Sequence, residues 1–507
     1  MTDDMTTGDL DWMPVTRRLL VDEGTSFDAN YVNDPACCPS RVTMLTGQYA
    51  HNTGVYSNGG ANGGFETAHQ LGLEDDTIAT RLQRAGYRTG LFGKYLNGYP
   101  NGVEPEWVPP GWTRWVSPVS GDPYSQYGYE LNVDGDLVQH ADAPDDYGTT
   151  VFARAARTFV RTSAQRGEPF FAALTVYAPH LPAVAAPGDV DRFPDARAPR
   201  TPNFNQRDVS ASPTFVRDLP RFGPRTIVAI DELYRERIRS LQAVDREVGR
   251  LVRAARDAGV LDNTYFVFTS DNGFHLGQHR LPAGKYSAYE HDIRVPLIVR
   301  GPGVAADARV DDAITGNVDL APTFEAMAGV RRPSSNDGRS VLALARSPET
   351  ASAWPRTAYL IERRRQVGSA APARDEDLPV EPSDPEAVST DAESAAESEG
   401  GDVAPAATPV IARPKEPVHR SMDARVLRRS GGVPDFDAVR TTRWLYVEYA
   451  DGQRELYDVR HDPDEVVNLA GRGHVSVEAT LHRRLDALRT CAGADCVAPT
   501  AASSAAG

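Results

Sequence analysis

The chain has few cysteines, no long apolar run and no excess of positive charge. It contains four cysteines in 507 residues: an adjacent pair, Cys37 and Cys38, and a second pair, Cys491 and Cys496, at the far end of the chain. No apolar run approaches the about 20 residues that cross a bilayer, so no membrane span is expected. The formal net charge of −16 argues against a nucleic-acid-binding protein, which needs a basic face.

The N-terminal residues also lack the pattern of a secretory signal peptide. Residues 1–10 are polar and acidic rather than basic and then apolar. Cys491 and Cys496, by contrast, enclose a short loop of the kind that a disulfide closes, which would indicate an oxidising compartment. Two reduced surface thiols are the alternative. The two ends of the chain therefore point to different compartments.

The composition is that of a soluble globular protein with one unusual segment. Charged residues make up 24% and hydrophobic residues 40%, and the length allows one large domain with an appendage, or two domains. Between about residues 368 and 417 the sequence changes to Ala, Pro, Glu, Asp and Ser, with too little apolar surface to order itself. An acidic interaction tail is the alternative for this segment. We therefore divide the chain into a main domain at 1–365, a disordered insertion at 366–418, a small unit at 419–490 and a tail at 491–507.

Helix and strand patterns alternate through the main domain. The predicted strands are 26–32, 87–92, 170–177, 264–269 and 357–361, and the predicted helices are 12–22, 75–85 and 233–258. This order favours an α/β fold with a mostly parallel sheet flanked by helices, whose site lies beyond the carboxyl ends of the strands. In the C-terminal unit, strands at 438–449 and 454–459 form a predicted hairpin, and a helix at 475–488 follows. That unit is expected to be a small α+β subdomain.

The stretch Cys-Cys-Pro-Ser-Arg at positions 37–41, soon followed by Leu-Thr-Gly, is the most specific motif. The alternative is a loop that holds a metal or a disulfide, but a zinc site needs two further ligands at suitable spacing. Two other candidates are the pair Asp3-Asp4 and the pair Asp271-Asn272, which directly follows a predicted strand. Such oxygen groups suit a hard cation such as calcium, although each pair alone is more often a frayed terminus or a turn.

Together these motifs resemble those of the type I sulfatases of the alkaline-phosphatase-like superfamily, in which the first cysteine of Cys-x-Pro-Ser-Arg is oxidised to formylglycine. The resemblance covers nearly the whole chain apart from the insertion. His-Asn-Thr-Gly-Val at 51–55 and Gly-Lys-Tyr-Leu-Asn at 93–97 make the chain most similar to the N-acetylglucosamine-6-sulfatase group. Many sulfatases have histidine two positions after the Gly-Lys lysine, where this chain has Leu96, and the glucosamine-6-sulfatase-like group shares that departure.

The resemblance implies roles for nine residues. Cys37 would become the formylglycine, made by a formylglycine-generating enzyme, and Arg41 would hold its diol in place. A divalent cation, usually calcium, would be bound by the formylglycine together with Asp3, Asp4, Asp271 and Asn272. The sulfate ester would contact Lys94, His180 and Lys285.

The implied chemistry is hydrolysis of a sulfate monoester on a sulfated sugar or a related small ester. A dication and lysines stabilise the charge that develops on the sulfate oxygens as the S–O bond breaks. One hydroxyl of the formylglycine hydrate attacks sulfur, and the second allows sulfate to leave the covalent intermediate. His180 or a lysine supplies the proton to the leaving alcohol. The alternatives are a phosphonate or phosphate ester hydrolase of the same superfamily, and a non-catalytic protein that binds a sulfated or phosphorylated ligand.

The resemblance also implies an apolar strand before the Asp-Asp pair, in the centre of the sheet. This chain begins two residues before Asp3, and the loss of that strand would leave its neighbours with unpaired backbone groups. Our hypothesis is that Met1 is a misassigned start or a fragment boundary, and that the natural chain continues upstream with a strand and a signal peptide. Such a protein would be secreted or periplasmic, in agreement with the Cys491–Cys496 pair.

Overall fold

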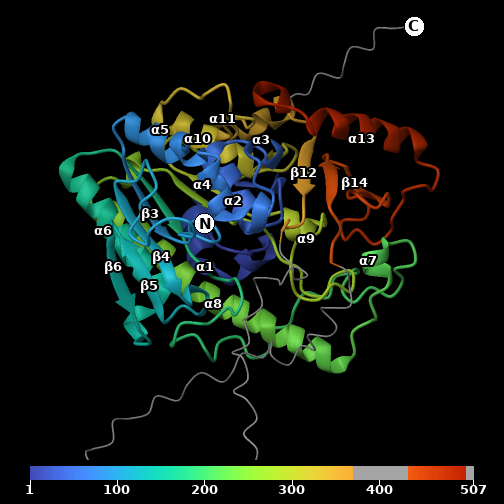
Figure 1. Cartoon of the computed structure of the whole chain (residues 1–507), viewed down its shortest axis with the longest axis horizontal. Coiled ribbons are helices and arrows are strands. Elements are labelled where there is room, and N and C mark those ends of the chain that lie inside the picture. The colour runs from blue at the N-terminus through green and yellow to red at the C-terminus, as the bar shows by residue number, and fades with distance from the viewer. Residues whose placement is uncertain (369–431, 498–507) are drawn as a thin grey trace, which may run out of the picture.

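The computed structural model describes residues 1–368 and 432–497, so most of the insertion predicted at 366–418 lies outside the described residues. Two β-sheets and the helices around them form the main domain, and a separate sheet forms the right-hand end of the molecule in Figure 1. Within the described ranges, no helix is both long and apolar enough to cross a membrane.

The first sheet of the main domain has five strands in the order β6-β5-β4-β3-β7. β3 is parallel to both β4 and β7, whereas β4, β5 and β6 form an antiparallel meander. The bounds are β3 Arg88–Gly93, β4 Arg114–Gly121, β5 Tyr129–Val133, β6 Asp136–His140 and β7 Phe170–Thr175. The strands predicted at 87–92 and 170–177 are therefore β3 and β7, which lie side by side at the parallel edge of this sheet.

The second sheet, in the order β10-β1-β9-β8, is also mixed. β1 is parallel to β10 and antiparallel to β9, and β9 is antiparallel to β8. The bounds are β1 Thr25–Phe27, β8 Phe266–Thr269, β9 Leu297–Arg300 and β10 Ala308–Val310, with β2 Asn30–Tyr31 and β11 Thr315–Gly316 as a separate parallel pair. The strand predicted at 26–32 is divided between β1 and β2, because the chain bends at Asp28 and Ala29.

The first residues of the chain lie between the two sheets. The Met1 amino group donates to the Leu174 carbonyl oxygen at 2.8 Å, and the Thr2 amide donates to the Thr269 carbonyl oxygen at 3.0 Å. The parts of β7 and β8 that are N-terminal to these contacts face each other across a cavity of about 750 Å³. Its lining includes Phe170, Ala172, Leu174, Phe266 and Phe268. In the part of the chain that the structure describes, this short extended segment joins the two sheets by backbone hydrogen bonds at their shared border.

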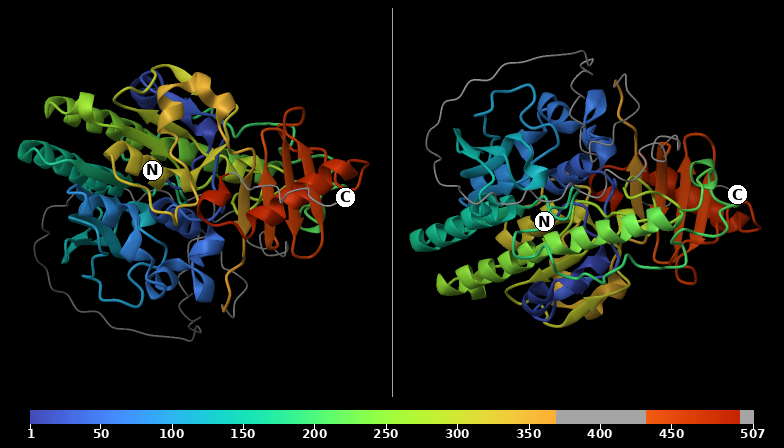
Figure 2. Two further views of the ribbon diagram at one scale, coloured as in Figure 1. Left: turned by 90° about the horizontal axis from the view of Figure 1, so that it is seen from above. Right: turned by 90° about the horizontal axis from the view of Figure 1, so that it is seen from below.

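Helices cover both sides of the sheets. The main ones are α2 Cys37–Thr46, α5 Ile78–Arg84, α6 Gly148–Arg166, α8 Pro224–Asp257 and α10 Leu320–Ala328, and the shorter ones are α1 Pro14–Thr16, α3 Ala50–Thr53, α4 Gly64–Gln70, α7 Thr214–Arg217, α9 Glu290–Ile293 and α11 Leu342–Arg346. The helix predicted at 233–258 begins nine residues earlier in the structure, because Gly223 and Pro224 provide an N-terminal start. Figure 2 shows α6 and α8 running side by side along one flank of the molecule.

The C-terminal unit is a four-stranded antiparallel sheet with one helix. Its strands are β12 Tyr359–Arg363, β13 Phe436–Arg440, β14 Trp444–Tyr449 and β15 Arg454–Asp458, in that order, and α13 Val475–Leu488 packs on them. The strand predicted at 357–361 was wrongly assigned to the main domain. As β12 it pairs along five residues with β13, and its apolar side chains join the core that β13–β15 share. The single strand predicted at 438–449 is two strands, because the chain turns back between Arg440 and Trp444.

Candidate active site

Loops at the strand ends bring all nine predicted site residues into one buried cluster. Lys94 follows β3, His180 follows β7, and Asp271-Asn272 follow β8. The other members are Asp3 and Asp4 from the N-terminal segment, Cys37 and Arg41 from α2, and Lys285 from the loop before α9. None of the nine is more than 3% exposed. Burying this many ionisable groups is unfavourable unless they are paired or hold a ligand, so the cluster is a strong candidate for a site.

Cys37 is the first residue of α2 and lies at the centre of the cluster. Its Sγ atom is 2.9 Å from Lys285 Nζ and 3.3 Å from Asp3 Oδ1. Burial raises the pKa of the Cys37 thiol well above its usual range, and Asp3 adds to the effect. The residue that caps the helix, Ala36, has no side chain that accepts from the first turn. The Cys38 amide of the first turn donates instead to Asn58 Oδ1 at 2.9 Å, and Pro39 has no N–H to donate.

The acidic and amide groups offer oxygen atoms to a cation. Asn272 Nδ2 donates to Asp4 Oδ1 at 2.6 Å, which turns the amide oxygen the other way. Among the described residues, neither Asp4 Oδ2 nor Asn272 Oδ1 accepts a hydrogen bond, although both are buried. Ligand atoms of Asp3, Asp4, Cys37 and His180 lie within 4.8 Å of one another. Buried carboxylate and amide oxygens that accept no hydrogen bond are suitable ligands for a hard divalent cation.

The backbone conformation at Asp4 also indicates a functional site. Its φ angle is +67°, in the left-handed region that non-glycine residues seldom adopt. The long helix α8 holds this turn in place, since the Arg237 guanidinium donates to the carbonyl oxygens of Asp4 and Pro179. Strained backbone that is fixed by a buried partner is common at functional sites.

Three basic side chains converge on the acidic groups. Arg41 Nε donates to Asp271 Oδ2 at 2.8 Å, Lys94 Nζ lies 2.7 Å from Asp3 Oδ2, and Lys285 Nζ donates to Asp4 Oδ1 at 2.9 Å. Burial alone would lower the pKa of Lys94, but Asp3, Cys37 and Tyr124 together outweigh it and the pKa lies well above its usual range. The chain has only three lysines, and two of them are in this cluster. The cluster therefore provides fixed positive charge for an anionic ligand.

His180 is held in one orientation. Its Nδ1 atom donates to the Leu181 carbonyl oxygen at 2.7 Å, and its Nε2 atom faces Asp4 Oδ2 at 3.7 Å. The ring of Tyr124 packs against it, with the ring centres 4.5 Å apart, and lies under Lys94 Nζ as well. His180 can therefore exchange a proton through Nε2.

Several supporting residues were missed by the sequence analysis. Ser40 donates to the Asp271 carbonyl oxygen, and Asn317 Nδ2 donates to Ser40 Oγ at 2.9 Å. Tyr124 and Arg237 belong to the same group, since they hold Lys94, His180 and Asp4 in place. Ser40 lies inside the recognised motif, but the other three lie far from it and no local pattern marks them.

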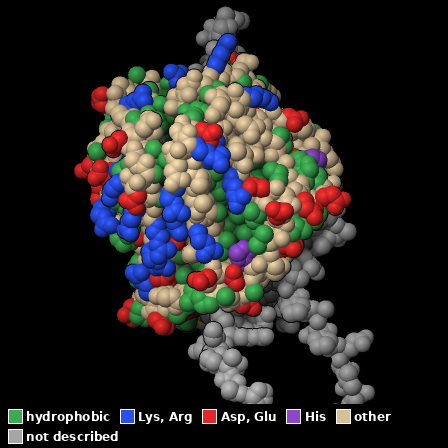
Figure 3. All heavy atoms as spheres, turned by 90° about the vertical axis from the view of Figure 1, so that its left-hand side faces the viewer, with side chains coloured by type: hydrophobic (Ala, Val, Ile, Leu, Met, Phe, Trp, Pro, Cys, Tyr) green, Lys and Arg blue, Asp and Glu red, His purple; other side chains and the backbone are tan. Residues whose placement is uncertain are grey.

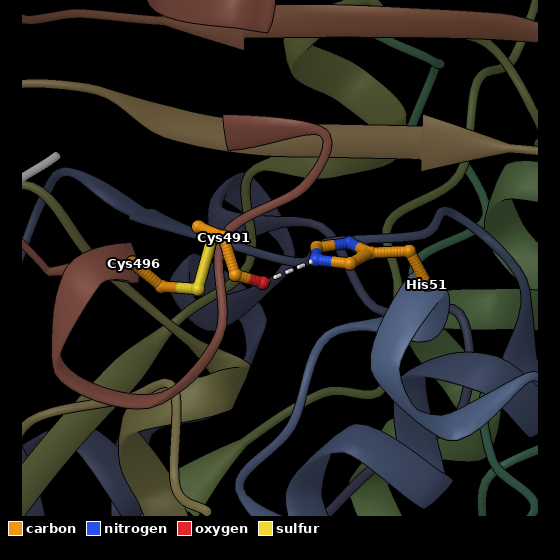
Figure 4. A group of neighbouring side chains, drawn as sticks. All are labelled: His51, Cys491 and Cys496. Atoms are coloured by element: carbon orange, nitrogen blue, oxygen red, sulfur yellow. Dashed lines mark hydrogen bonds between the residues drawn. A yellow bond between two sulfur atoms is a disulfide. The ribbon is translucent and has the colours of Figure 1, made fainter. Parts of the chain in front are cut away.

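A second group of potential ligands, His51, Cys491 and Cys496, is not a metal site (Figure 4). The two cysteines form the disulfide that the sequence predicted. His51 Nε2 donates to the Cys491 carbonyl oxygen at 2.8 Å, so this group fastens the C-terminal loop to α3.

Known proteins show the same family and fold. The family model described as Sulfatase matches residues 4–330. The N-acetylglucosamine-6-sulfatase of Homo sapiens is 30% identical over 500 residues, which cover 96% of this chain and 82% of that protein. An extracellular sulfatase SULF-1 homolog of Drosophila melanogaster is 37% identical over 381 residues, 73% of this chain. The chain spans only 33% of that relative and 47% of a similar one from Caenorhabditis elegans.

Solved structures agree at the level of the fold. A protein solved with its substrate D-glucosamine-2-N,6-O-disulfate is 21% identical, with a TM-score of 0.70 over 96% of this chain and 95% of its own. A phosphonate monoester hydrolase from Silicibacter pomeroyi is 23% identical, with a TM-score of 0.63 over 96% and 93%. The fold is thus alkaline-phosphatase-like, and with its Cys-Cys-Pro-Ser-Arg motif at the centre of a buried charged cluster, the chain belongs to the sulfatase family.

Proposed function

We propose that this sulfatase hydrolyses a sulfate monoester of an amino sugar, using a formylglycine made from Cys37 and a bound divalent cation, most simply calcium. The observation that carries the proposal is the position of Cys37, at the start of α2 and in contact with both Lys285 and Asp3. The cation would be held by the modified Cys37 and by the four oxygen-bearing residues Asp3, Asp4, Asp271 and Asn272. When bound, the cation and the hydrated formylglycine would supply charge neutralisation and a nucleophilic hydroxyl.

The remaining residues bind and orient the ester. Lys94 and Lys285 point their ammonium groups at the space beside Cys37, where they would hold two sulfate oxygens. Arg41 is fixed by Asp271 and by the Lys94 carbonyl oxygen at 2.9 Å, so it positions residue 37 rather than moving with the substrate. Such preorganised cations stabilise the charge that develops in the transition state.

His180 is our candidate for the proton donor to the leaving alcohol. Its Nδ1 atom is committed to a backbone carbonyl, so only Nε2 can carry a transferable proton. A histidine oriented in this way suits general acid catalysis near neutral pH.

The substrate class is inferred from the relatives. N-acetylglucosamine-6-sulfatases match this chain at 30–35% identity, and a protein of the same fold was solved with a sulfated glucosamine. Two relatives are described as extracellular sulfatases, which supports secretion. The proposed formylglycine would require a formylglycine-generating enzyme as a partner during maturation. A phosphonate monoester hydrolase also shares the fold, so the ester class needs a direct test.

The test has two parts. The first is the mass of the tryptic peptide 19–41 from protein made in a host that converts other sulfatases, where sulfur should be lost from Cys37 and a carbonyl oxygen gained. The second compares kcat/KM for N-acetylglucosamine-6-sulfate, an aryl sulfate and the matched aryl phosphonate. An unmodified thiol at Cys37 would contradict the proposed nucleophile. A higher kcat/KM for the phosphonate would identify the protein as a phosphonate ester hydrolase.

A further inference from the structure

Basic side chains form a band on the face of the molecule that carries the ends of α6 and α8 (Figure 3). A groove of about 410 Å³ lies between α8 and the α1 region. We call it the arginine groove. Its lining is Val15, Arg18, Leu19, Arg246, Gly249, Arg250, Val252, Arg253 and Arg256.

Helical spacing places four of the five arginines in one row. Arg246, Arg250, Arg253 and Arg256 are three or four residues apart on α8, so they follow one face of that helix for roughly 15 Å. Arg18 lies on the opposite wall. Gly249 brings the walls close together, because a β-carbon there would lie 2.8 Å from Val15 Cγ1.

Much of this positive charge is not neutralised. Arg246 pairs with Asp189 and Arg250 pairs with Glu247, at 2.6 Å in each case. Within the described part of the chain, no carboxylate forms an ion pair with the other three, Arg18, Arg253 and Arg256, and all three are exposed. Like charges at this helical spacing destabilise a helix. A row of them on a protein with a net charge of −16 therefore suggests that an anion binds there.

A second row on α6 extends the positive field. Arg154, Arg157 and Arg161 face the same region, and burial lowers the pKa of Arg157 with further contributions from Arg250, Arg161 and Arg154. Arg157 forms an ion pair with Glu247, the same carboxylate that pairs with Arg250, so two guanidinium groups share one acidic partner. An anionic ligand would relieve this repulsion.

The chemistry of the lining identifies the class of anion. Guanidinium groups bind the planar edges and paired oxygens of sulfate and carboxylate groups with two hydrogen bonds. The lining contains no aromatic side chain, and proteins that bind single-stranded nucleic acids depend on aromatic rings for base stacking. The charge pattern therefore fits a polysaccharide with repeated sulfate groups.

We propose that the arginine groove binds a stretch of sulfated glycan, as a docking site separate from the active site. The inference rests on the proposed function, since a sulfatase needs a sulfated substrate. Arg237 of α8 contacts Asp4 in the active site, and the groove lies roughly 14 to 29 Å farther along the same helix. A glycan held there stays close to the catalytic cluster, which raises its effective concentration.

The test is binding of the full-length protein to heparin, a densely sulfated glycan, at several salt concentrations. The variant Arg18→Gln/Arg253→Gln/Arg256→Gln should bind about ten-fold more weakly and lower the slope of log K against log salt by about two to three. The control variant, Arg472→Gln/Arg483→Gln/Arg484→Gln, loses the same charge from exposed positions on the C-terminal unit and should bind as the unmodified protein does. The groove variant should also lower the ratio of kcat/KM for a sulfated polymer to that for a monosaccharide sulfate.

Equal weakening in both variants would overturn the proposal, because binding would then follow net charge alone. Single-stranded DNA that displaces heparin at the same charge concentration would overturn it as well. Thermal unfolding of both variants shows whether a loss of binding reflects a loss of folding. The binding measurement does not depend on turnover. Heparin binding that requires the groove therefore supports the docking site even if the protein hydrolyses no sulfate ester. The absence of hydrolysis would contradict only the proposed function.

Discussion

At the residue scale, Asp4 and Asn272 are the two residues of the site that bear most directly on cation binding. Both are buried, and each has one oxygen that accepts no hydrogen bond from the described residues. A buried polar atom left in this state is unfavourable by about 1–3 kcal/mol, and a bound cation removes the deficit. The proposal of a cation site therefore depends on these two residues more than on the presence of acidic groups alone.

We expect chelation to abolish hydrolysis and calcium to restore it. Asp4→Asn and Asn272→Ala should each raise the calcium concentration needed for half-maximal activity by about 10- to 100-fold, because each removes or weakens an oxygen ligand. The measurement is activity against free calcium after treatment with EDTA. Asn263→Ala, at an exposed position after α8, is the control. Full activity of Asn272→Ala without added calcium would contradict the assignment.

A second residue-scale prediction concerns His279, which is fully buried. Its Nδ1 atom donates to Gln206 Oε1 at 3.0 Å and its Nε2 atom accepts from Asn203 Nδ2 at 3.2 Å, and the second of these hydrogen bonds needs the neutral ring. Burial lowers the pKa of His279 well below its usual range, with added repulsion from His291 and His275.

The sign of the pH effect follows from this shift. Below about pH 6.5 the unfolded chain takes up a proton at this position and the folded protein does not, so stability is full above that pH and falls as the pH falls. The loss should reach about 1.4 kcal/mol between pH 7.5 and 5.5. His279→Gln should show a smaller loss, whereas His461→Gln, an exposed control, should behave as the unmodified protein. Urea unfolding at the two pH values measures the difference, and equal losses in all three proteins would refute the role of His279.

At the scale of single elements, the C-terminal disulfide loop is fastened to α3. His51 and Asn52 both bond to the Cys491 carbonyl oxygen, and the Gly493 amide donates to Asp337. Closing so short a loop, with a sequence separation of 5 between the cysteines, stabilises a protein by about 2 kcal/mol in the chain-entropy account. The hydrogen bonds add to this by fixing the loop against the main domain.

Reduction of the disulfide should therefore lower Tm but leave catalysis intact. The variant Cys491→Ser/Cys496→Ser should unfold at a lower temperature than the oxidised protein, and a reductant should have no further effect on it. Cys37 and Cys38 form no disulfide, so a mild reductant has no bond to break there. Thermal scans with and without dithiothreitol measure the effect. An unchanged Tm on reduction would show that the hydrogen bonds alone hold the loop.

At the scale of the whole molecule, the border between the two sheets is bridged along part of its length. Among the described residues, residues 1–3 bridge β7 and β8, and a cavity with a largely apolar lining lies between the rest of the two strands. The backbone groups along the two facing edges are available to an extended segment that would run parallel to β7 into Met1.

An engineered extension offers a test of this description. Six residues rich in valine and isoleucine, added before Met1, should pair with both edges and raise Tm by at least about 3 °C, because a strand buried on both faces is apolar throughout. A Gly-Ser extension of the same length is the control and should leave Tm unchanged. Differential scanning calorimetry measures both, and equal Tm values would mean that the cavity does not accept a strand.

The sequence by itself determined what local patterns encode. The helix at 475–488 was predicted to the residue, because its apolar spacing is continuous and its ends are marked. The disulfide and the Cys-Cys-Pro-Ser-Arg motif were also visible, since each lies within a few positions of the chain. The nine site residues were named through resemblance to a family, and no local signal joined Asp3 to Lys285.

The tertiary structure alone decided which distant segments meet. Lys285 reaches Asp4 across 281 positions, and Arg237 supports that turn from the middle of α8. The strand predicted at 357–361 belongs to the C-terminal sheet because, as β12, it pairs with β13 along its whole length. Its own apolar pattern does not specify which strand it pairs with. The arginine groove likewise exists only where α8 packs on the segment that carries Arg18. Packing across long separations creates these sites, and the period of a helix or strand reports only which of its faces is buried.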